Sequence, residues 1–596
     1  MIEELVFDLE GDNLYHDITK LWGCGVMQDN GEAMWIENPD EYLDLLTRAK
    51  SIIGHNIVGY DLPVLLKMFK WEPKKSQIIQ DTMIHSRLHY THLKSIDKNS
   101  TKWDISGKLT GSHSLGAWGI RMGEPKIPSP DFSTWTDEDI PYALQDIVVT
   151  KKLWEFFKKK EYSEDAMRNE HGFAKIITRQ MHYGVDFDVE SAKELYIKLH
   201  KDKEKLGHEL TKAFLGFWKF EGELTPKVAD KKRCYQKGSV LSKIKWVEFS
   251  AGSRDHIAIG LKRKYKWKPT KFTKAGNITI DSGVLEDLKK TIPEAEDIDT
   301  YLVISKLLGY LGDGKESWLQ NEKNGRMYGY VNTNGAVTGR CTHSKPNLGQ
   351  VPSSRKPYGS ECRALFRAGR GRVLLGFDAS GLELRGLGHF MAPWDNGQYA
   401  KWAAEGTKEL GTDPHSVQAK VLGIDRDVEK TWFYAYIYGA GNPKLGAILS
   451  GSPKIGGQSK RTIETKIPAL GKLTEAVQKA SKRGHLVGLD GRLVQVRSSH
   501  AALNTLLQSA GAIIMKRALI ITDATLQEEH GLIPGIDFEW VLNIHDEYQC
   551  DCATEAVAKL IGETCKLSLQ LAGEHYGFKC RLDGDYAIGK DWSETH

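Results

Sequence analysis

Two acidic residues far apart in the chain, Asp378 and Asp546, carry the clearest potential for chemistry. Asp378 follows the apolar run 372–377, which predicts a buried strand, and Asp546 lies between two strand-like runs, 540–544 and 548–550, where a hairpin tip is expected. Carboxylates at neighbouring strand ends can hold two magnesium ions about 3.5–4 Å apart, the arrangement that drives in-line phosphoryl displacement. Alone, either residue would be interpreted as a surface or capping acid.

A second acidic set begins near the N-terminus. The alternating segment 5–10 predicts a strand, and its period of two places Asp8 and Glu10 on one face. Two acids on one face of a strand are unfavourable in a core but useful for a metal ion. Asp61, after another apolar stretch, offers a third carboxylate.

A predicted helix over 136–158 supplies two further groups. Acidic residues crowd its first turn, and Tyr142 and Asp146 share a face because they are four positions apart. Four acids from three separate elements can form a second two-metal site, in which the attacking group is a water molecule oriented by the Tyr142 hydroxyl. Taken singly, Asp61 or Asp146 would be interpreted as a solvated acid at a helix end.

A third segment, 426–438, predicts a helix with a functional stripe. Asp425 is a candidate N-cap, Gly439 is a candidate stop, and four residues recur at intervals of four: Arg426, Lys430, Tyr434 and Tyr438. The stripe is about 18 Å long. Two cations near a helix start can bind a triphosphate, and aromatic rings can stack on a base pair. Without the acid pair, an amphipathic core helix with solvated charges would be the favoured interpretation.

These segments resemble motifs A, B and C of the family A (Pol I-type) DNA polymerases, at 378–385, 426–439 and 544–547. The resemblance is greatest to the replicative DNA polymerases of T-seven-type podoviruses and covers nearly the whole chain, with a gap in the third hundred residues. It continues through the segments 334–340, 346–348, 490–492 and 501–512. The N-terminal acids resemble the three motifs of the tyrosine-containing DEDD-type 3′–5′ exonucleases.

The resemblance implies a multidomain α/β and α+β protein, in which an RNase H-like 3′–5′ exonuclease domain precedes a right-hand polymerase of thumb, palm and fingers. The expected boundaries are 1–160 for the exonuclease domain, 165–325 for the thumb, 326–400 for the first part of the palm, 401–480 for the fingers, and 481–596 for the remainder of the fingers and the second part of the palm. A connecting helical bundle is a compatible interpretation of 165–325.

The resemblance also implies roles for single residues. The catalytic set is Asp378, Asp546 and Glu547 for polymerisation and Asp8, Glu10, Asp61, Tyr142 and Asp146 for the exonuclease. The metal ligands are Asp378, Ala379, Asp546, Asp8, Glu10, Asp61 and Asp146. The nucleotide-binding set is Arg426, Lys430, Tyr434, Tyr438, Glu383 and His415. The DNA-binding set is Arg340, Asn504, Gln508 and His545.

Three of these residues have specific implied roles. Glu383 matches the steric gate whose side chain occupies the space of a ribose 2′-hydroxyl. Asn504 and Gln508, four apart on a predicted helix, can donate to purine N3 and pyrimidine O2, minor-groove acceptors found on every correct base pair. A buried amide pair bonded to backbone is the alternative for these two.

Composition bounds the class of protein. The 596 residues are 40% hydrophobic and 27% charged, with a net charge of +4, which is typical of a multidomain soluble protein and does not by itself demand a nucleic-acid partner. Eight cysteines without a C-x-x-C pair indicate reduced thiols in a cytoplasm, that of the host cell if the protein is viral. No targeting signal is visible, and no apolar run is expected to reach the roughly 18–20 residues that span a membrane.

These observations predict a template-directed DNA polymerase with 3′–5′ proofreading that replicates a viral genome. Its expected cofactors are two Mg²⁺ ions per active site, replaceable by Mn²⁺. Its expected partners are primer–template DNA, dNTPs and a replicative helicase-primase. A Pol I-type repair or organellar enzyme is one alternative, and a catalytically inactive nucleic-acid-binding remnant is another.

The segment 217–250 is strongly basic. In the podovirus polymerases that the chain resembles, the matching insertion is long and binds host thioredoxin as a clamp. Here it is short, so a thioredoxin clamp is not expected. Its basic residues are Lys219, Lys227, Lys231, Lys232, Arg233, Lys237, Lys243 and Lys245. Two interpretations remain open, a solvated loop and an electropositive flap that grips duplex phosphates.

Overall fold

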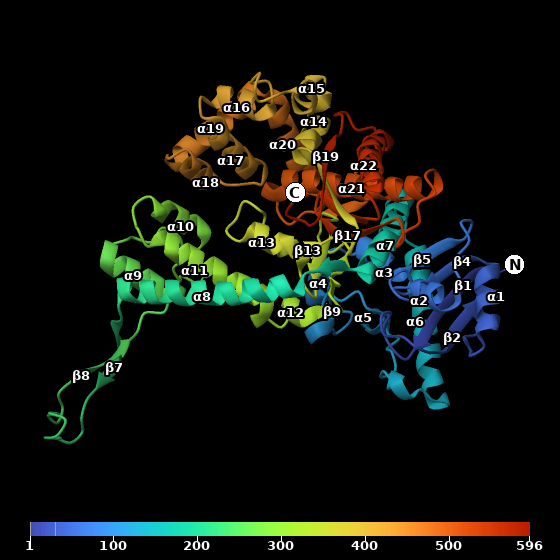
Figure 1. The fold of residues 1–596 in the computed structure, drawn as a ribbon, viewed down its shortest axis with the longest axis horizontal. Helices are drawn as coiled ribbons and strands as arrows, with labels where there is room; N and C mark the ends of the chain where they lie inside the picture. Colours follow the sequence, from blue (N-terminus) through green and yellow to red (C-terminus); the bar gives the residue numbers. More distant parts are fainter. Residues whose placement is uncertain (1, 30, 274) are drawn as a thin grey trace. The chain divides into compact units, whose positions relative to one another are not determined.

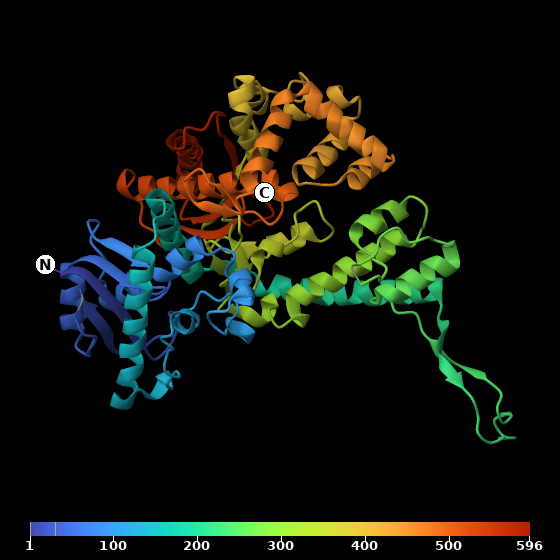
Figure 2. The same cartoon turned by 180° about the vertical axis from the view of Figure 1, so that it is seen from behind.

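A computed structural model describes residues 2–29, 31–273 and 275–596. The chain forms two compact units (Figures 1 and 2). Unit 1 comprises Met1–Val185, Tyr328–Gln350 and Arg367–His596, and unit 2 comprises Asp186–Met327 and Val351–Phe366. The predicted domain boundaries remain predictions. The helix α7 (Glu164–Tyr183), expected at the start of the thumb, belongs to unit 1.

The N-terminal part of unit 1 is a mixed five-stranded sheet with helices, in the order β3-β2-β1-β4-β5. Its strands are β1 (Ile2–Gly11), β2 (Leu21–Gln28), β3 (Met34–Ile36), β4 (Ala49–Gly54) and β5 (Ile78–Asp81). Its helices are α1 (Pro39–Arg48), α2 (Asp61–Phe69), α3 (Thr82–His89), α4 (Leu93–Asn99), α5 (Leu115–Met122) and α6 (Ile140–Lys158). Strand β1 pairs antiparallel with β2 and parallel with β4.

Strand β1 is buried on both faces. Its odd-numbered residues Leu5, Phe7 and Leu9 belong to one apolar cluster, whereas Val6 belongs to another with Ile147 of α6. The period of two therefore turns the even-numbered side chains of β1 toward α6.

The central part of unit 1 is an antiparallel four-stranded sheet in the order β17-β18-β14-β19. Its strands are β14 (Val373–Ala379), β17 (Phe538–Ile544), β18 (Glu547–Cys552) and β19 (Gly584–Gly589). The helices α7, α21 (Ala502–Glu528) and α22 (Glu555–His575) share its apolar core, which includes Phe173, Phe377, Ile514, Trp540 and Leu569. A short hairpin, β11 (Tyr330–Asn332) and β12 (Thr342–Ser344), belongs to the same unit.

A second apolar core of unit 1 is almost entirely helical. Its elements are α14 (Leu382–Asp395), α15 (Gln398–Glu405), α16 (Pro414–Leu422), α17 (Arg426–Ile437), α18 (Asn442–Ile448), α19 (Pro453–Lys466), α20 (Pro468–Ser481), β15 (His485–Val487) and β16 (Leu493–Gln495). Gly381 begins α14 with a φ of +57°, a left-handed backbone that glycine adopts without strain. Trp432 and Phe433 of α17 are fully buried here.

One helix corrects the expectation about membrane-length segments. The segment Ser499–Glu528, which contains α21, is long and apolar enough to cross a membrane by length and composition. Within the protein, however, 78% of its most apolar window is buried. Because α21 packs against α7 and α22 in the core, its apolar composition is accounted for by packing. All eight cysteines are free thiols, as expected.

Unit 2 is mainly helical, with α8 (Val189–Phe214), α9 (Arg254–Tyr265), α10 (Ser282–Lys289), α11 (Ala295–Leu308), α12 (Trp318–Asn321) and α13 (Gly359–Ala364). Its core joins Leu210 and Phe214 of α8 to Leu261, Leu285 and Ile298. The hairpin of β7 (Phe217–Leu224) and β8 (Leu241–Val247) extends from these helices (Figures 1 and 2). A small sheet, β13-β6-β10-β9, contains β6 (Val185–Phe187), β9 (Glu322–Lys323), β10 (Arg326–Met327) and β13 (Phe366–Arg367).

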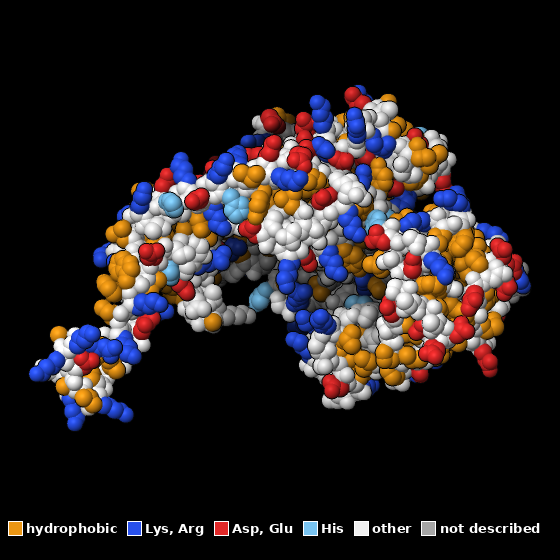
Figure 3. All heavy atoms as spheres, turned by 60° about the horizontal axis from the view of Figure 1, so that its bottom comes forward, with side chains coloured by type: hydrophobic (Ala, Val, Ile, Leu, Met, Phe, Trp, Pro, Cys, Tyr) orange, Lys and Arg blue, Asp and Glu red, His pale blue; other side chains and the backbone are white. Residues whose placement is uncertain are grey.

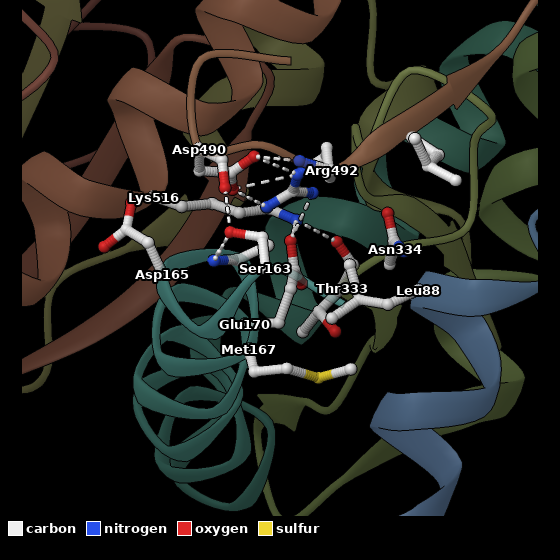
Figure 4. A network of polar contacts seen from close by, with 12 residues as sticks. Leu88, Ser163, Asp165, Met167, Glu170, Thr333, Asn334, Asp490, Arg492 and Lys516 are labelled. Atoms are coloured by element: carbon white, nitrogen blue, oxygen red, sulfur yellow. Dashed lines mark hydrogen bonds and ion pairs between the residues drawn. The ribbon is translucent and has the colours of Figure 1, made fainter. Parts of the chain in front are cut away.

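A buried ion network joins separate parts of unit 1 (Figure 4). Glu170 Oε1 on α7 accepts hydrogen bonds from Arg492 at 2.7 Å and from Lys516 of α21 at 2.5 Å. Arg492 also pairs with Asp490 at 2.5 Å, and all four side chains are nearly inaccessible to solvent. Because a buried charge without its partner is strongly destabilising, this network fixes α7 against α21.

We expect Glu170→Gln to lower the free energy of unfolding of unit 1 by about 3 kcal/mol, because it leaves the Lys516 ammonium buried without a counter-charge. Thermal or urea unfolding would measure the shift. Glu164→Gln is the matched control, since Glu164 lies exposed on the same helix and pairs only loosely with Arg168 at 3.8 Å. Equal unfolding midpoints for the two variants would contradict a structural role for the network.

Candidate active sites

The first site is assembled by the pairing of β14 with its neighbours. Asp378 on β14 lies opposite Glu547 of β18 and opposite Asp585 of β19. Asp546 occupies the β17–β18 turn, and its carbonyl oxygen accepts a hydrogen bond from Ala379 N at 3.1 Å. The two aspartates that the sequence singles out therefore lie next to each other at the end of the central sheet.

The electrostatics of this site favour a cation. Burial, followed by the negative charges of Asp546, Glu547 and Asp585, raises the pKa of Asp378 to about 7. Like charges held this close disfavour ionisation unless a positive charge is present. Asp585 was missed by the sequence analysis; its carboxylate accepts a hydrogen bond from Ser380 Oγ at 2.9 Å. Only the β14–β19 register reveals it, since nothing local to residue 585 does.

Glu547 differs from the two aspartates in its surroundings. It is buried, and its Oε1 accepts hydrogen bonds from Gln549 Nε2 at 2.7 Å and from the indole of Trp592. Its Oε2 lies 3.3 Å from Nδ1 of His596. The C-terminal residues therefore hold the carboxylate that the sequence analysis placed in the catalytic set.

Two buried acids, Asp413 and Glu429, position an arginine and a histidine at the start of α17. Asp425 caps the helix by accepting hydrogen bonds from the amides of residues 427 and 428. Arg426 pairs with Asp413 at 2.8 Å. Glu429, fully buried, accepts from Nδ1 of His415 at 2.8 Å. The sequence analysis missed Asp413 and Glu429. The one sequence feature that could have indicated them is that each is an acidic residue near cationic ones in the chain.

The remaining nucleotide-site residues differ in exposure. Lys430 is exposed, and the rings of Tyr434 and Tyr438 lie 6.0 Å apart on the same stripe. Burial raises the pKa of Tyr434 to about 12, with the nearby Glu383 carboxylate contributing. His415 is buried beside Tyr434, with ring centroids 5.6 Å apart, so only its Nε2 is left for a ligand.

Residues from four separate segments meet at the first turn of α14. Arg340 donates to Glu383 Oε1 at 3.2 Å. His545 adopts a φ of +61°, and burial, with help from the Arg340 charge, lowers its pKa. The Arg340, Glu383 and Asp546 charges all act on Tyr438. The structure thus brings motif A, motif B, motif C and the 334–340 segment together.

Asn504 and Gln508 lie on the same helix, α21, and both are partly exposed. Among the described residues, neither amide forms a hydrogen bond with the protein, and Asn504 Oδ1 is buried without a partner. The alternative of a pair bonded to backbone is therefore absent from the described part of the chain, and both amides are available to a ligand.

The second site lies between β1 and α6. Asp8, Glu10 and Asp146 offer oxygen atoms that all lie within 4.8 Å of one another. Asp61, the first residue of α2, is anchored beside them because its Oδ1 accepts from Leu9 N at 2.9 Å. The four predicted acids are therefore gathered by a strand and two helices.

This acidic cluster fits a divalent cation. Burial and neighbouring carboxylates raise the pKa of Asp8 strongly and that of Glu10 to about 8; burial raises the pKa of Asp61 to about 7. Among the described residues, no hydrogen-bond partner lies near the buried atoms Glu10 Oε1 and Asp146 Oδ1. Carboxylate oxygens are the ligands that Mg²⁺ prefers, so the donor set and its unpaired atoms match such an ion.

Lys126 joins this site, although no pattern in its proline-rich loop indicated such a role. Its Nζ donates to the Tyr142 hydroxyl at 2.9 Å and forms an ion pair with Asp146. Burial alone would lower the pKa of Lys126, but the Asp146 carboxylate raises it overall. The lysine therefore stays charged and fixes the phenol and the carboxylate relative to each other.

Comparison with known proteins identifies the family of the chain. Residues 227–594 match the model of DNA polymerase family A. The DNA-directed DNA polymerase of Enterobacteria phage T3 is 35% identical, over 99% of this chain and 100% of its own length. That of Escherichia phage T7 is 34% identical over the same shares of the two chains.

A solved structure supports the fold independently. The POL domain of Pol1 from M. smegmatis, solved in complex with DNA primer-template and dNTP, superposes with a TM-score of 0.76 at 16% identity. The match covers 100% of this chain and 97% of that one, and it shows the expected right-hand polymerase fold. With a family model that spans well over half of its length and two full-length relatives above 30% identity, the chain belongs to DNA polymerase family A and is a DNA-directed DNA polymerase.

Proposed function

We propose that this polymerase extends a primer at one two-metal site and removes nucleotides from its 3′ end at another. The observation that carries the proposal is the presence of two separate clusters of carboxylates, one formed by strand pairing around Asp378 and one formed by Asp8, Glu10 and Asp146. When bound, Mg²⁺ would supply electrophilic stabilisation of the phosphoryl group at each site. The candidate ligands are Asp378, Ala379 and Asp546 at the first site and Asp8, Glu10, Asp61 and Asp146 at the second.

At the first site, the side chains around the aspartates would select and orient the nucleotide. Arg426 and Lys430 would bind the triphosphate at the positive end of α17, and Tyr434 would stack on the incoming base. Glu383, held by Arg340, would fill the space of a 2′-hydroxyl and so favour dNTPs. These groups are already oriented before the reaction. Less free energy is therefore needed to reorganise the surroundings as charge develops on the phosphoryl group in the transition state.

The proposed DNA contacts lie next to these groups. Asn504 and Gln508 would donate to minor-groove acceptors of the nascent pair, a test of pair geometry that is blind to sequence. Arg340 and His545 would contact the primer terminus. The relatives from phages T3 and T7 support genome replication in the host cytoplasm as the setting, whereas a helicase-primase partner and the absence of a thioredoxin clamp remain predictions.

At the second site, Tyr142 would orient the attacking water. The Lys126 ammonium donates to the Tyr142 oxygen, and the Tyr142 hydroxyl also interacts with the Asp146 carboxylate, so the phenol is held beside the acidic cluster. Because Lys126 also pairs with Asp146, it fixes the distance between the water-binding phenol and the acidic cluster.

The proposal includes the domain limits. These are 1–160 for the nuclease and 165–325, 326–400, 401–480 and 481–596 for the parts of the polymerase.

We expect Asp378→Asn to lower primer extension about a thousandfold or more, because it removes a metal-binding charge at the polymerase site alone. Primer extension with dNTPs and Mg²⁺ would measure the loss, and a lane without dNTPs would report degradation as an internal control. Degradation should persist near the parental rate. Near-normal extension by this variant would refute the assignment of Asp378.

The double variant Asp8→Ala, Glu10→Ala should have the opposite phenotype. Degradation of single-stranded 3′ ends should become undetectable, while extension from a matched primer should stay at the parental rate. Extension from a mismatched primer should rise, because the mismatch is no longer removed. If the double variant degraded primers like the parent, the N-terminal acids would not form a nuclease site.

The raised pKa values predict a pH-dependent stability in the absence of metal. The folded protein holds a proton on Glu10 up to about pH 8, whereas the unfolded chain releases it near 4.5. Stability in EDTA should therefore be full below about pH 4.5 and fall as the pH rises toward about 8. Thermal unfolding across that range would measure the fall, and Mg²⁺ should stabilise the protein more at the higher pH.

The variant Glu10→Gln tests the origin of this effect, because it cannot release the proton. Its thermal midpoint in EDTA should depend less on pH than that of the parent. The matched control is Glu32→Gln, since Glu32 is an exposed acid of the same part of the chain. An identical pH profile for the parent and Glu10→Gln would show that the cluster does not behave as described.

A further inference from the structure

The β7–β8 hairpin of unit 2 exposes large apolar side chains on one face. Trp218 lies directly opposite Trp246, with ring centroids 5.3 Å apart, and Phe220 lies opposite Ile244. Residues paired in this way share a face of the ribbon. The exposed fractions are 62% for Trp218, 58% for Phe220, 56% for Ile244 and 46% for Trp246. These side chains are therefore not part of the core of unit 2.

The other face of the hairpin carries three lysines, although β7 also contains the exposed acids Glu221 and Glu223. Lys219 lies directly opposite Lys245. Lys243 lies two positions before Lys245 on β8 and therefore points to the same face. Among the described residues, none of these three lysines has an acidic partner within ion-pair distance. Figure 3 shows Lys and Arg side chains gathered with hydrophobic ones over this projecting hairpin. Like charges placed directly opposite each other are unfavourable, so this arrangement gains from a bound anion.

Structural requirements alone do not account for this composition. Lysines on an isolated two-stranded ribbon can protect its open edges from pairing with other chains. Exposed tryptophan and phenylalanine have the reverse effect, because they add an apolar surface that favours association. A patch of aromatic rings backed by unpaired lysines is instead the combination that binds single-stranded nucleic acid.

We propose that the β7–β8 hairpin binds single-stranded DNA, such as the unpaired template of this polymerase. Trp218, Phe220 and Trp246 would stack on successive bases, whose faces are accessible in a single strand and hidden within a duplex. Lys219, Lys243 and Lys245 would neutralise phosphates. The ribbon is only two strands wide, with about 4.8 Å between its strands, so the long flexible stems of these lysines can reach around its open edges to the phosphates of a strand that stacks on the aromatic face.

The aromatic contribution is tested by the triple variant Trp218→Ala, Phe220→Ala, Trp246→Ala in the full chain. Binding of a fluorescent oligothymidylate would be measured by anisotropy in EDTA, which prevents degradation. We expect the affinity to fall at least tenfold, while the affinity for blunt duplex DNA stays unchanged. The control is Phe272→Ala, which truncates another aromatic residue of unit 2 that is 55% exposed.

The basic contribution is tested by the variant Lys219→Gln, Lys243→Gln, Lys245→Gln. For a single strand, the slope of log affinity against log salt should shrink by about 0.7 for each phosphate that the variant no longer neutralises, about 2 in all. The charge-matched control replaces three exposed lysines of unit 1, Lys50, Lys70 and Lys75, by glutamine, and it should keep the parental slope.

Photocrosslinking locates the site directly, independently of any effect of the variants on folding. An oligonucleotide with 5-bromodeoxyuridine should crosslink to peptides within 217–250 in the parent and lose these crosslinks in the aromatic variant. Extension of a short primed template should be unchanged in both hairpin variants, because none of these residues belongs to the active site. Three outcomes would each overturn the proposal. The aromatic substitutions could leave the affinity for oligothymidylate unchanged, they could weaken duplex binding equally, or a protein could be found that occupies the hairpin and excludes DNA.

Discussion

The antiparallel pairing of β14 with both β18 and β19 is the constraint on which the polymerase site depends. This register places Asp378 between Glu547 and Asp585 and beside the turn that holds Asp546. The pairing holds the backbones of these residues on adjacent strands about 4.7–4.9 Å apart, so the negative charges stay near one another even without a cation. A slip of one residue would turn Asp378 to the other face of the sheet and dismantle the site.

A common electrostatic logic underlies both acidic clusters. Folding buries carboxylates that repel one another, and the cost appears as raised pKa values for Asp378, Glu10 and Asp61. Apolar burial on the opposite faces of the same strands offsets this cost, because Phe377 and Phe7 lie in the main cores. The free energy gained by burying apolar side chains therefore holds the carboxylates close enough together to bind cations.

Groups that bind the nucleotide are held in turn by buried partners. Glu429 and Asp413 anchor His415 and Arg426, and the network of Glu170 ties α7 to α21, the helix that carries Asn504 and Gln508. Such support matters because catalysis by positioning tolerates little misplacement of the reacting groups. In contrast, Trp218, Phe220 and Trp246 of the β7–β8 hairpin are largely exposed, and its strand lysines have no acidic partner among the described residues, as suits a surface that meets a ligand.

Local patterns of residues were enough to predict the elements that carry the candidate site, whereas most of the residue roles were implied by the family resemblance. The apolar run before Asp378, the N-cap Asp425, the four-residue stripe of α17 and the two-residue period of β1 are such patterns, and local backbone geometry follows from them. Tertiary structure alone brought Lys126 to Tyr142, Asp585 to Asp378, and the C-terminal Trp592 to Glu547. The apolar length of α21 was likewise interpretable only once its burial was known. These outcomes depend on strand register and on packing between segments far apart in the chain, which no local pattern encodes.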